Sequence, residues 1–223
     1  MTICEGAFAE YLKKFPDMTE YTAAIVPHLK ERPLGAVSIF LDANVVLMMA
    51  WHEDFLKSIL SCGARNRPDS AREYFKTCGR DGERLAASTW DLPSLIKAAQ
   101  RRVTFKNRGR AITRLFEHLF GFPLWPDEDT QNRVLDLNVL RQLVVHHGGA
   151  SLGDDYWNQL SDKKVVSTKK YGDLPVIRRI DYHYCTTVFM KDAFLALARQ
   201  AYHVRDELLK RPEWVYVSGP KTG

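Results

Sequence analysis

Residues 36–62 read AVSIFLDANVVLMMAWHEDFLKSILSC, and this stretch decides the fold class. Its apolar residues recur at the three- and four-residue spacing of a helix face. Asp42 and Asn44 interrupt its first half, whereas a membrane-spanning helix needs about 20 mostly apolar residues. We therefore interpret the stretch as a long helix buried in a protein core and ending at Gly63.

The rest of the chain is also helical in pattern. Proline, glycine and capping residues such as Asp91 divide it into segments of helical periodicity. Further helices are expected at 5–15, 17–31, 69–78, 92–102, 106–120, 128–147, 152–161 and 183–211. Residues 164–182 look extended instead, with a turn at 171–173. The sequence thus predicts an all-α helical bundle with a small extended or β-hairpin insertion near 164–182.

The composition is that of a globular protein. Hydrophobic residues make up 45% of the chain and charged residues 26%, which excludes a disordered or fibrous chain. We expect a helical arm at 1–35, a helical domain at 36–211 and a flexible tail at 212–223. The N-terminus lacks the basic region and apolar core of a secretory signal, so we expect a cytoplasmic protein.

The four cysteines, Cys4, Cys62, Cys78 and Cys185, are scattered singly, without a C-x-x-C pair. This spacing indicates neither a zinc knuckle nor a redox motif. Disulfides are rare in the cytosol, so we expect buried thiols. The chain also lacks a P-loop and a G-x-S-x-G elbow, so Walker-type nucleotide binding and serine-hydrolase chemistry are not indicated.

Positive charge is concentrated in two segments. The 223 residues include 32 basic and 27 acidic ones, a net charge of +5. Residues 99–114 hold six basic residues and no acid, and residues 163–179 hold six and one acid. Such segments are either solvated surface or suit a polyanion, because cations that contact phosphates release counterions. Phe105 and Tyr171 lie within them and are expected to stack on bases. The candidate RNA-binding residues are Arg101, Arg102, Lys106, Arg108, Arg110, Arg114, Lys169 and Lys170.

Two of the predicted helices carry a charge on an otherwise apolar stripe. In 128–147, Arg141 falls on the face of Val134, Leu137 and Val144. In 36–62, Glu53 falls on the face of Val46, Met49, Leu56 and Leu60. A charge at the edge of a core needs a partner, so we expect Glu53 to pair with Arg141. This pair is either a structural salt bridge or part of a site.

The end of the same helix adds titratable groups. His146 and His147 follow Arg141 and stand just before Gly148-Gly149. The negative end of the helix dipole makes a histidine there more basic. His146 can take the proton from a ribose 2′-OH or protonate the leaving oxygen, while Arg141 holds the phosphate. Glu53 would orient the guanidinium, and these parts suffice for metal-free RNA cleavage.

These residues resemble the HEPN (higher eukaryotes and prokaryotes nucleotide-binding) family. Its members carry an Arg, four to six intervening residues and a His, which here are Arg141 and His146 or His147. Residues 51–57 (WHEDFLK) are similar to the family's first core helix, and the resemblance covers about residues 36–210. It implies a homodimer whose Arg-His motifs line one cleft, with metal-independent endoribonuclease activity and no cofactor. The family is common in toxin–antitoxin and antiphage systems, which implies an antitoxin or regulatory protein as a partner.

Other interpretations stay open. Gln142, a supporting residue in this site, stands where active members carry Asn, Asp or His. This departure favours a non-catalytic module that binds nucleic acid, nucleotide or a partner protein. Arg178 and His183 form a second match to the same spacing, and Asp181, His183 and Cys185 would share one face of a strand as a metal site. For the ribonuclease we expect single-stranded RNA, because the 2′-OH must line up with the scissile phosphate.

Overall fold

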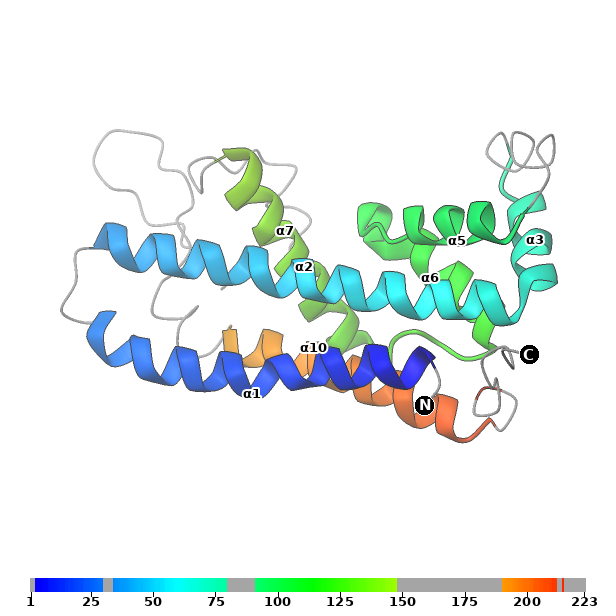
Figure 1. The fold of residues 1–223 in the computed structure, drawn as a ribbon. Coiled ribbons are helices and arrows are strands. Elements are labelled where there is room, and N and C mark those ends of the chain that lie inside the picture. Colours follow the sequence, from blue (N-terminus) through cyan, green and yellow to red (C-terminus); the bar gives the residue numbers. More distant parts are fainter. Residues whose placement is uncertain (1–2, 30–33, 80–90, 148–189, 212–213, 215–223) are drawn as a thin grey trace. The chain divides into compact units, whose positions relative to one another are not determined.

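The computed structural model describes residues 3–29, 34–79, 91–147, 190–211 and 214 (Figure 1). Among these residues there are seven α-helices and no strand, which confirms the predicted all-α class. None of the described helices is long and apolar enough to cross a membrane. The predicted helix at 152–161, the extended insertion near 164–182 and most of the predicted tail lie outside the described residues.

The first helix, α1 (Ile3–Leu29), is continuous. The prediction of two helices, at 5–15 and 17–31, is therefore wrong. The helix continues through Pro16, which removes one backbone hydrogen bond and usually kinks or ends a helix. Pro16 is exposed, so water can satisfy the carbonyl that loses its amide partner.

The second helix, α2 (Leu34–Asn66), contains the whole of the predicted 36–62 helix. It does not end at Gly63, as predicted, but continues for three more residues. Gly63 serves packing instead. A Cβ atom at this position would lie 2.7 Å from Cζ of Phe120, closer than carbon atoms can approach. The absence of a side chain therefore lets α2 approach the end of α6.

Three helices follow in the middle of the chain: α3 (Pro68–Lys76), α5 (Leu92–Arg101) and α6 (Lys106–Phe120). They confirm the helices predicted at 69–78, 92–102 and 106–120, and α3 packs on both α5 and α6. The Asp91 carboxylate accepts a 2.9 Å hydrogen bond from the Ser94 N–H and caps α5, as predicted. This bonding holds the pKa of Asp91 below its ordinary value.

The last two described helices are α7 (Glu128–His147) and α10 (Met190–Leu209). The bounds of α7 are those predicted. Asp127 caps α7 by accepting a 2.6 Å hydrogen bond from the Thr130 N–H, and this bond lowers the pKa of Asp127. The helix predicted at 183–211 begins no later than Met190, because residues 183–189 are outside the described part.

The chain forms two compact units, each built from separate segments. The first unit contains Met1–Leu12, His52–Pro126 and Gln200–Gly223. The second contains Lys13–Trp51 and Asp127–Arg199. The helices α1, α2 and α10 each contribute to both units. The whole of α3, α5 and α6 belongs to the first unit, and the whole of α7 belongs to the second.

Aromatic side chains fill the core of the first unit where α1 meets α2. Phe8 packs edge-on against Phe55 at a centroid distance of 5.2 Å, and Tyr11 stacks on the same ring at 4.4 Å. Phe116, Phe120 and Trp214 extend this core, with the last two rings 4.7 Å apart. Such pairs add stabilisation beyond their buried area.

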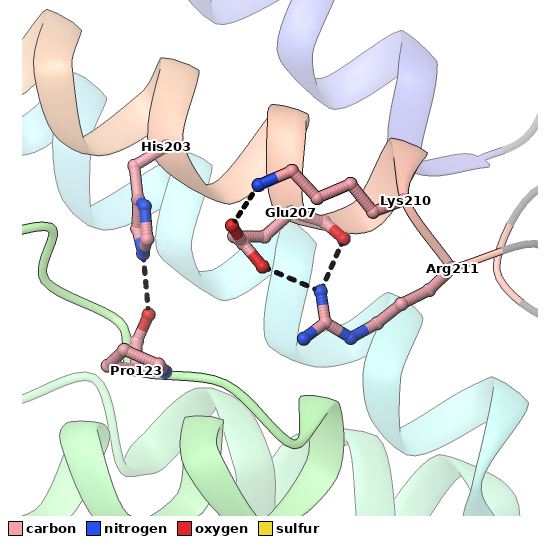
Figure 2. Close-up of polar contacts among 5 residues, drawn as sticks. All are labelled: Pro123, His203, Glu207, Lys210 and Arg211. Atoms are coloured by element: carbon pink, nitrogen blue, oxygen red, sulfur yellow. Dashed lines mark hydrogen bonds and ion pairs between the residues drawn. The ribbon is translucent and has the colours of Figure 1, made fainter.

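Polar contacts hold the C-terminal part of α10 in place within the first unit (Figure 2). His203 Nε2 donates a 2.9 Å hydrogen bond to the carbonyl oxygen of Pro123. Glu207 accepts hydrogen bonds from Lys210 at 2.6 Å and from Arg211 at 2.8 Å. These two bonds lower the pKa of Glu207 to about 2, so the carboxylate stays ionised and holds both cations.

One cysteine departs from expectation. Cys62 is buried in α2 and forms a disulfide, whereas the sequence predicted only buried thiols. Cys78 is a free thiol, and the side chains of Cys4 and Cys185 are not among those described. The cytoplasmic location stays a prediction.

Candidate functional site

Seven basic residues lie on α5, on α6 and in the turn between them. We call them the basic segment: Lys97, Arg101, Arg102, Lys106, Arg108, Arg110 and Arg114. All except Arg102 are exposed, and no Asp or Glu occurs between Leu92 and Phe116. Lys97 was missed by the sequence analysis because it lies just outside 99–114. The guanidinium of Arg102 lies over the ring of Phe75, 5.7 Å from its centroid, where it is half-buried.

The basic segment includes a turn of unusual backbone. Asn107, Arg108 and Gly109 have φ angles of 51°, 56° and 68°, so three successive residues are left-handed. The Gly109 N–H donates a 3.2 Å hydrogen bond to the Phe105 carbonyl, and right-handed helix follows from Arg110. Asn and Gly tolerate this conformation, but for Arg108 it costs about 1–2 kcal/mol. The predicted amphipathic helix is therefore regular only over its later part.

Phe105 does not take the role expected of it. Its ring is buried and stacks on His52 at a centroid distance of 6.1 Å, so it cannot stack on a base. The apolar ring instead anchors the turn before α6 to α2. Tyr171, the other aromatic residue expected to stack, is outside the described residues.

The regular part of α6 aligns three exposed polar residues. Arg110, Arg114 and His118 are spaced four residues apart, so they are neighbours on one face of the helix. Each step of four residues advances about 6 Å along the helix axis. The face therefore presents two guanidinium groups and an imidazole in a row.

His118 is held in place by α3. Its Nε2 donates a 3.0 Å hydrogen bond to the carbonyl oxygen of Ser70, and its ring lies 5.5 Å from the ring of Tyr74. Tyr74 is half-buried, and its hydroxyl donates a 3.4 Å hydrogen bond to the Ala111 carbonyl. Burial raises the pKa of Tyr74, while the charges of Arg102 and Arg114 oppose this change. Only the packing of α3 on α6 joins His118 to Tyr74, so no spacing along the chain indicates the pair.

On α7, the backbone is helical from Glu128 to His147 without a break. Arg141 and Gln142 are half-exposed on this helix, and the side chains of His146 and His147 are not described. Arg141 and His146 are five residues apart, which is about 140° around the axis of a regular helix. Val134 and Leu137 are fully buried, which confirms the apolar stripe that leads to Arg141.

The stripe on α2 is confirmed except at Val46, which is half-exposed. Met49, Leu56 and Leu60 are buried, and Glu53 is half-exposed among them. Glu53 belongs to the first unit and Arg141 to the second, and each has interaction partners. The pairing of these two residues stays a prediction.

The remaining candidates fall outside the described residues. These are Lys169 and Lys170 of the second basic region, Arg178 of the second motif, and the possible metal ligands Asp181, His183 and Cys185. Within the described ranges, His, Cys, Asp and Glu side chains do not gather in a group that could hold a metal ion.

No protein-family model, curated protein or solved structure matches the chain.

Proposed function

We propose that this protein binds RNA through the basic segment of α5 and α6. Six exposed cations within 18 residues, with no acid among them, support this proposal. Positive side chains that are close together along one segment repel one another, and a polyanion relieves that repulsion. Each phosphate they contact releases condensed counterions, which makes binding favourable and dependent on salt.

Charge reversal tests this binding. The variant carrying Arg110→Glu and Arg114→Glu should bind labelled single-stranded RNA at least tenfold more weakly than the wild type, since it replaces two attractive contacts with two repulsive ones. Lys57→Glu is the matched control, because Lys57 is a surface cation of the same unit outside the basic segment. Equal affinity of the wild type and the double variant would refute the role of α6.

We further propose that the protein cleaves the bound RNA with Arg141 and His146. His146 would move the proton between the ribose 2′-OH and the leaving oxygen, and Arg141 would stabilise the charge on the phosphate. Glu53, Gln142 and His147 would support the site. Because Arg141 and His146 are about 140° apart around one helix, the proposal requires Arg141 of one protomer to act with His146 of a second in a homodimer.

Cleavage is tested with the purified protein and total RNA in excess chelator. The wild type should cut RNA, because no step needs a metal, and Arg141→Ala and His146→Ala should each abolish cutting. Mixing the two inactive variants should restore part of the activity if one site draws on two chains. Arg178→Ala is the control for the second Arg-His spacing and should remain active. Activity that survives in both motif variants would refute this assignment.

The alternative is an RNA-binding module without catalysis. Gln142, with one methylene more than Asn, favours it because the longer amide displaces the hydrogen-bonding group beside Arg141. In that case the wild type binds RNA with the same dependence on Arg110 and Arg114, but the RNA stays intact. The HEPN resemblance, a toxin or defence role and an antitoxin partner remain part of the cleavage proposal.

A further inference from the structure

A pair of aromatic rings lies next to the two exposed arginines of α6, Arg110 and Arg114. Tyr74 of α3 and His118 of α6 are 5.5 Å apart, with their ring planes inclined by 50°. His118 is one helical turn beyond Arg114, and Arg114 is one turn beyond Arg110. All of these residues belong to the first unit, so their arrangement does not depend on the placement of the second.

The exposed ring of His118 is fixed rather than free to rotate. Its Nε2 is committed to the Ser70 carbonyl at 3.0 Å, and one side of the ring lies toward Tyr74. The hydroxyl of Tyr74 is in turn bonded to the carbonyl of Ala111 in α6. A surface ring that is already ordered loses little side-chain entropy when a ligand packs against it. An exposed histidine without such a hydrogen bond would lose more side-chain entropy on binding a ligand.

Two arginines lie near the pair. Arg114 is one helical turn before His118 on α6, and the guanidinium of Arg102 lies over the ring of Phe75, the residue next to Tyr74 in α3. Phosphates held by Arg110 and Arg114 would bring the next nucleotide of the same strand toward His118. A nucleobase has an apolar, polarisable face that stacks on such rings, and stacking requires a base that is not already stacked within a duplex.

We propose that Tyr74 and His118 form a base-stacking subsite at the end of the basic segment, which gives the protein a preference for single-stranded over double-stranded RNA. This inference rests on the proposed RNA binding and adds to it the residues that would select the single-stranded form. Arg110 and Arg114 would supply affinity for either form through phosphates, whereas the ring pair would act only on an unpaired base.

The test compares a single-stranded RNA 12-mer with a duplex of the same sequence. His118→Ala should weaken binding of the single strand about fivefold or more, the lower end of what one stacked base contributes, and leave binding of the duplex unchanged. His118→Phe should retain most of the wild-type preference, because it keeps a ring that can stack on a base, although it loses the hydrogen bond to Ser70. Equal weakening for both RNA forms, or no weakening for either, would overturn the subsite.

A second measurement uses the wild type alone and so does not depend on how the variants fold. The protein should bind the 12-mer more tightly than an abasic sugar-phosphate strand of the same length and charge. Equal affinity for the two strands would overturn the subsite while leaving the proposed RNA binding intact. Absence of salt-dependent binding to any strand would refute RNA binding itself, and the subsite with it.

Discussion

The hydroxyl of Tyr11 lies 2.9 Å from Nδ1 of His52, and both side chains are buried. This hydrogen bond joins the start of α1 to the middle of α2. The His52 ring also contacts Phe55 and Phe105, so three parts of the first unit meet at one imidazole. His52 Nε2 has no hydrogen-bond partner among the described residues. Burial lowers the pKa of His52 to about 3, so the ring is neutral in the folded protein.

His52 makes the fold sensitive to mild acid. The unfolded chain binds a proton at His52 below its ordinary pKa of 6.5, whereas the folded protein does not until about pH 3. The unfolded state therefore holds more protons in this window. The free energy of unfolding should fall as the pH falls, by up to about 1.4 kcal/mol per pH unit. Urea unfolding at pH 6.5 and at pH 5 measures the effect.

The control is His52→Gln, which keeps a group that can bond to Tyr11 but does not titrate. Its free energy of unfolding should change much less than that of the wild type between these two pH values. If both proteins lose the same stability, His52 is not the group responsible.

Gly63 should not tolerate a side chain. The Cβ atom of Gly63→Ala would meet Phe120 at 2.7 Å and Leu119 at 3.2 Å, and both neighbours are buried. We expect a loss of about 1–3 kcal/mol in the free energy of unfolding, as for other overpacked cores. Thermal or urea denaturation would measure it.

Gly6→Ala is the matched control for this substitution. Gly6 lies inside α1, and a Cβ atom there would have no neighbour within 4 Å. Alanine loses less backbone entropy than glycine in a helix, so this variant should gain roughly 0.5–1 kcal/mol. Similar effects from the two substitutions would contradict the packing role of Gly63.

The number of thiols that react before and after reduction tests the disulfide of Cys62. The chain has four cysteines, so one intramolecular bond should leave two that alkylate in denaturant without reductant, and four after reduction. Peptide mapping should find Cys78 alkylated in both samples and Cys62 only in the reduced one. Replacing Cys62 by Ser should destabilise the oxidised protein by about 2–4 kcal/mol. Four reactive thiols before reduction would refute the bond.

Local signals in the sequence predicted most of the helices. Asp91 and Asp127 are capping residues that act on backbone amides three residues away, so their effects can be predicted without knowing the fold. Gly63 looked like a helix end because glycine has that local preference, yet its role is set by Phe120, which is 57 residues further along the chain. Pro16 likewise has a local preference for a helix end. However, α1 continues through it, because Pro16 is exposed and water can satisfy the carbonyl that loses its amide partner.

In the candidate site, too, the features that depend on local sequence could be predicted, and those that depend on tertiary packing could not. The basic residues of α5 and α6 are apparent from composition, and their exposure follows from their charge. The burial of Phe105 against His52 and the pairing of Tyr74 with His118 arise from tertiary packing, which no sequence spacing encodes. The left-handed turn at Asn107–Gly109 also escaped prediction, although Asn and Gly are the residues that favour it.

The salt dependence of RNA binding shows whether the cations of α6 contact phosphates. For the wild type, the logarithm of the association constant should fall linearly with the logarithm of salt concentration, with a slope of about −0.7 for each phosphate contacted. Replacing Arg110 and Arg114 with Ala should make the slope shallower by about 1.4, whereas Lys57→Ala should leave it unchanged. A wild-type slope near zero, or the same slope in the double variant, would contradict phosphate binding by α6.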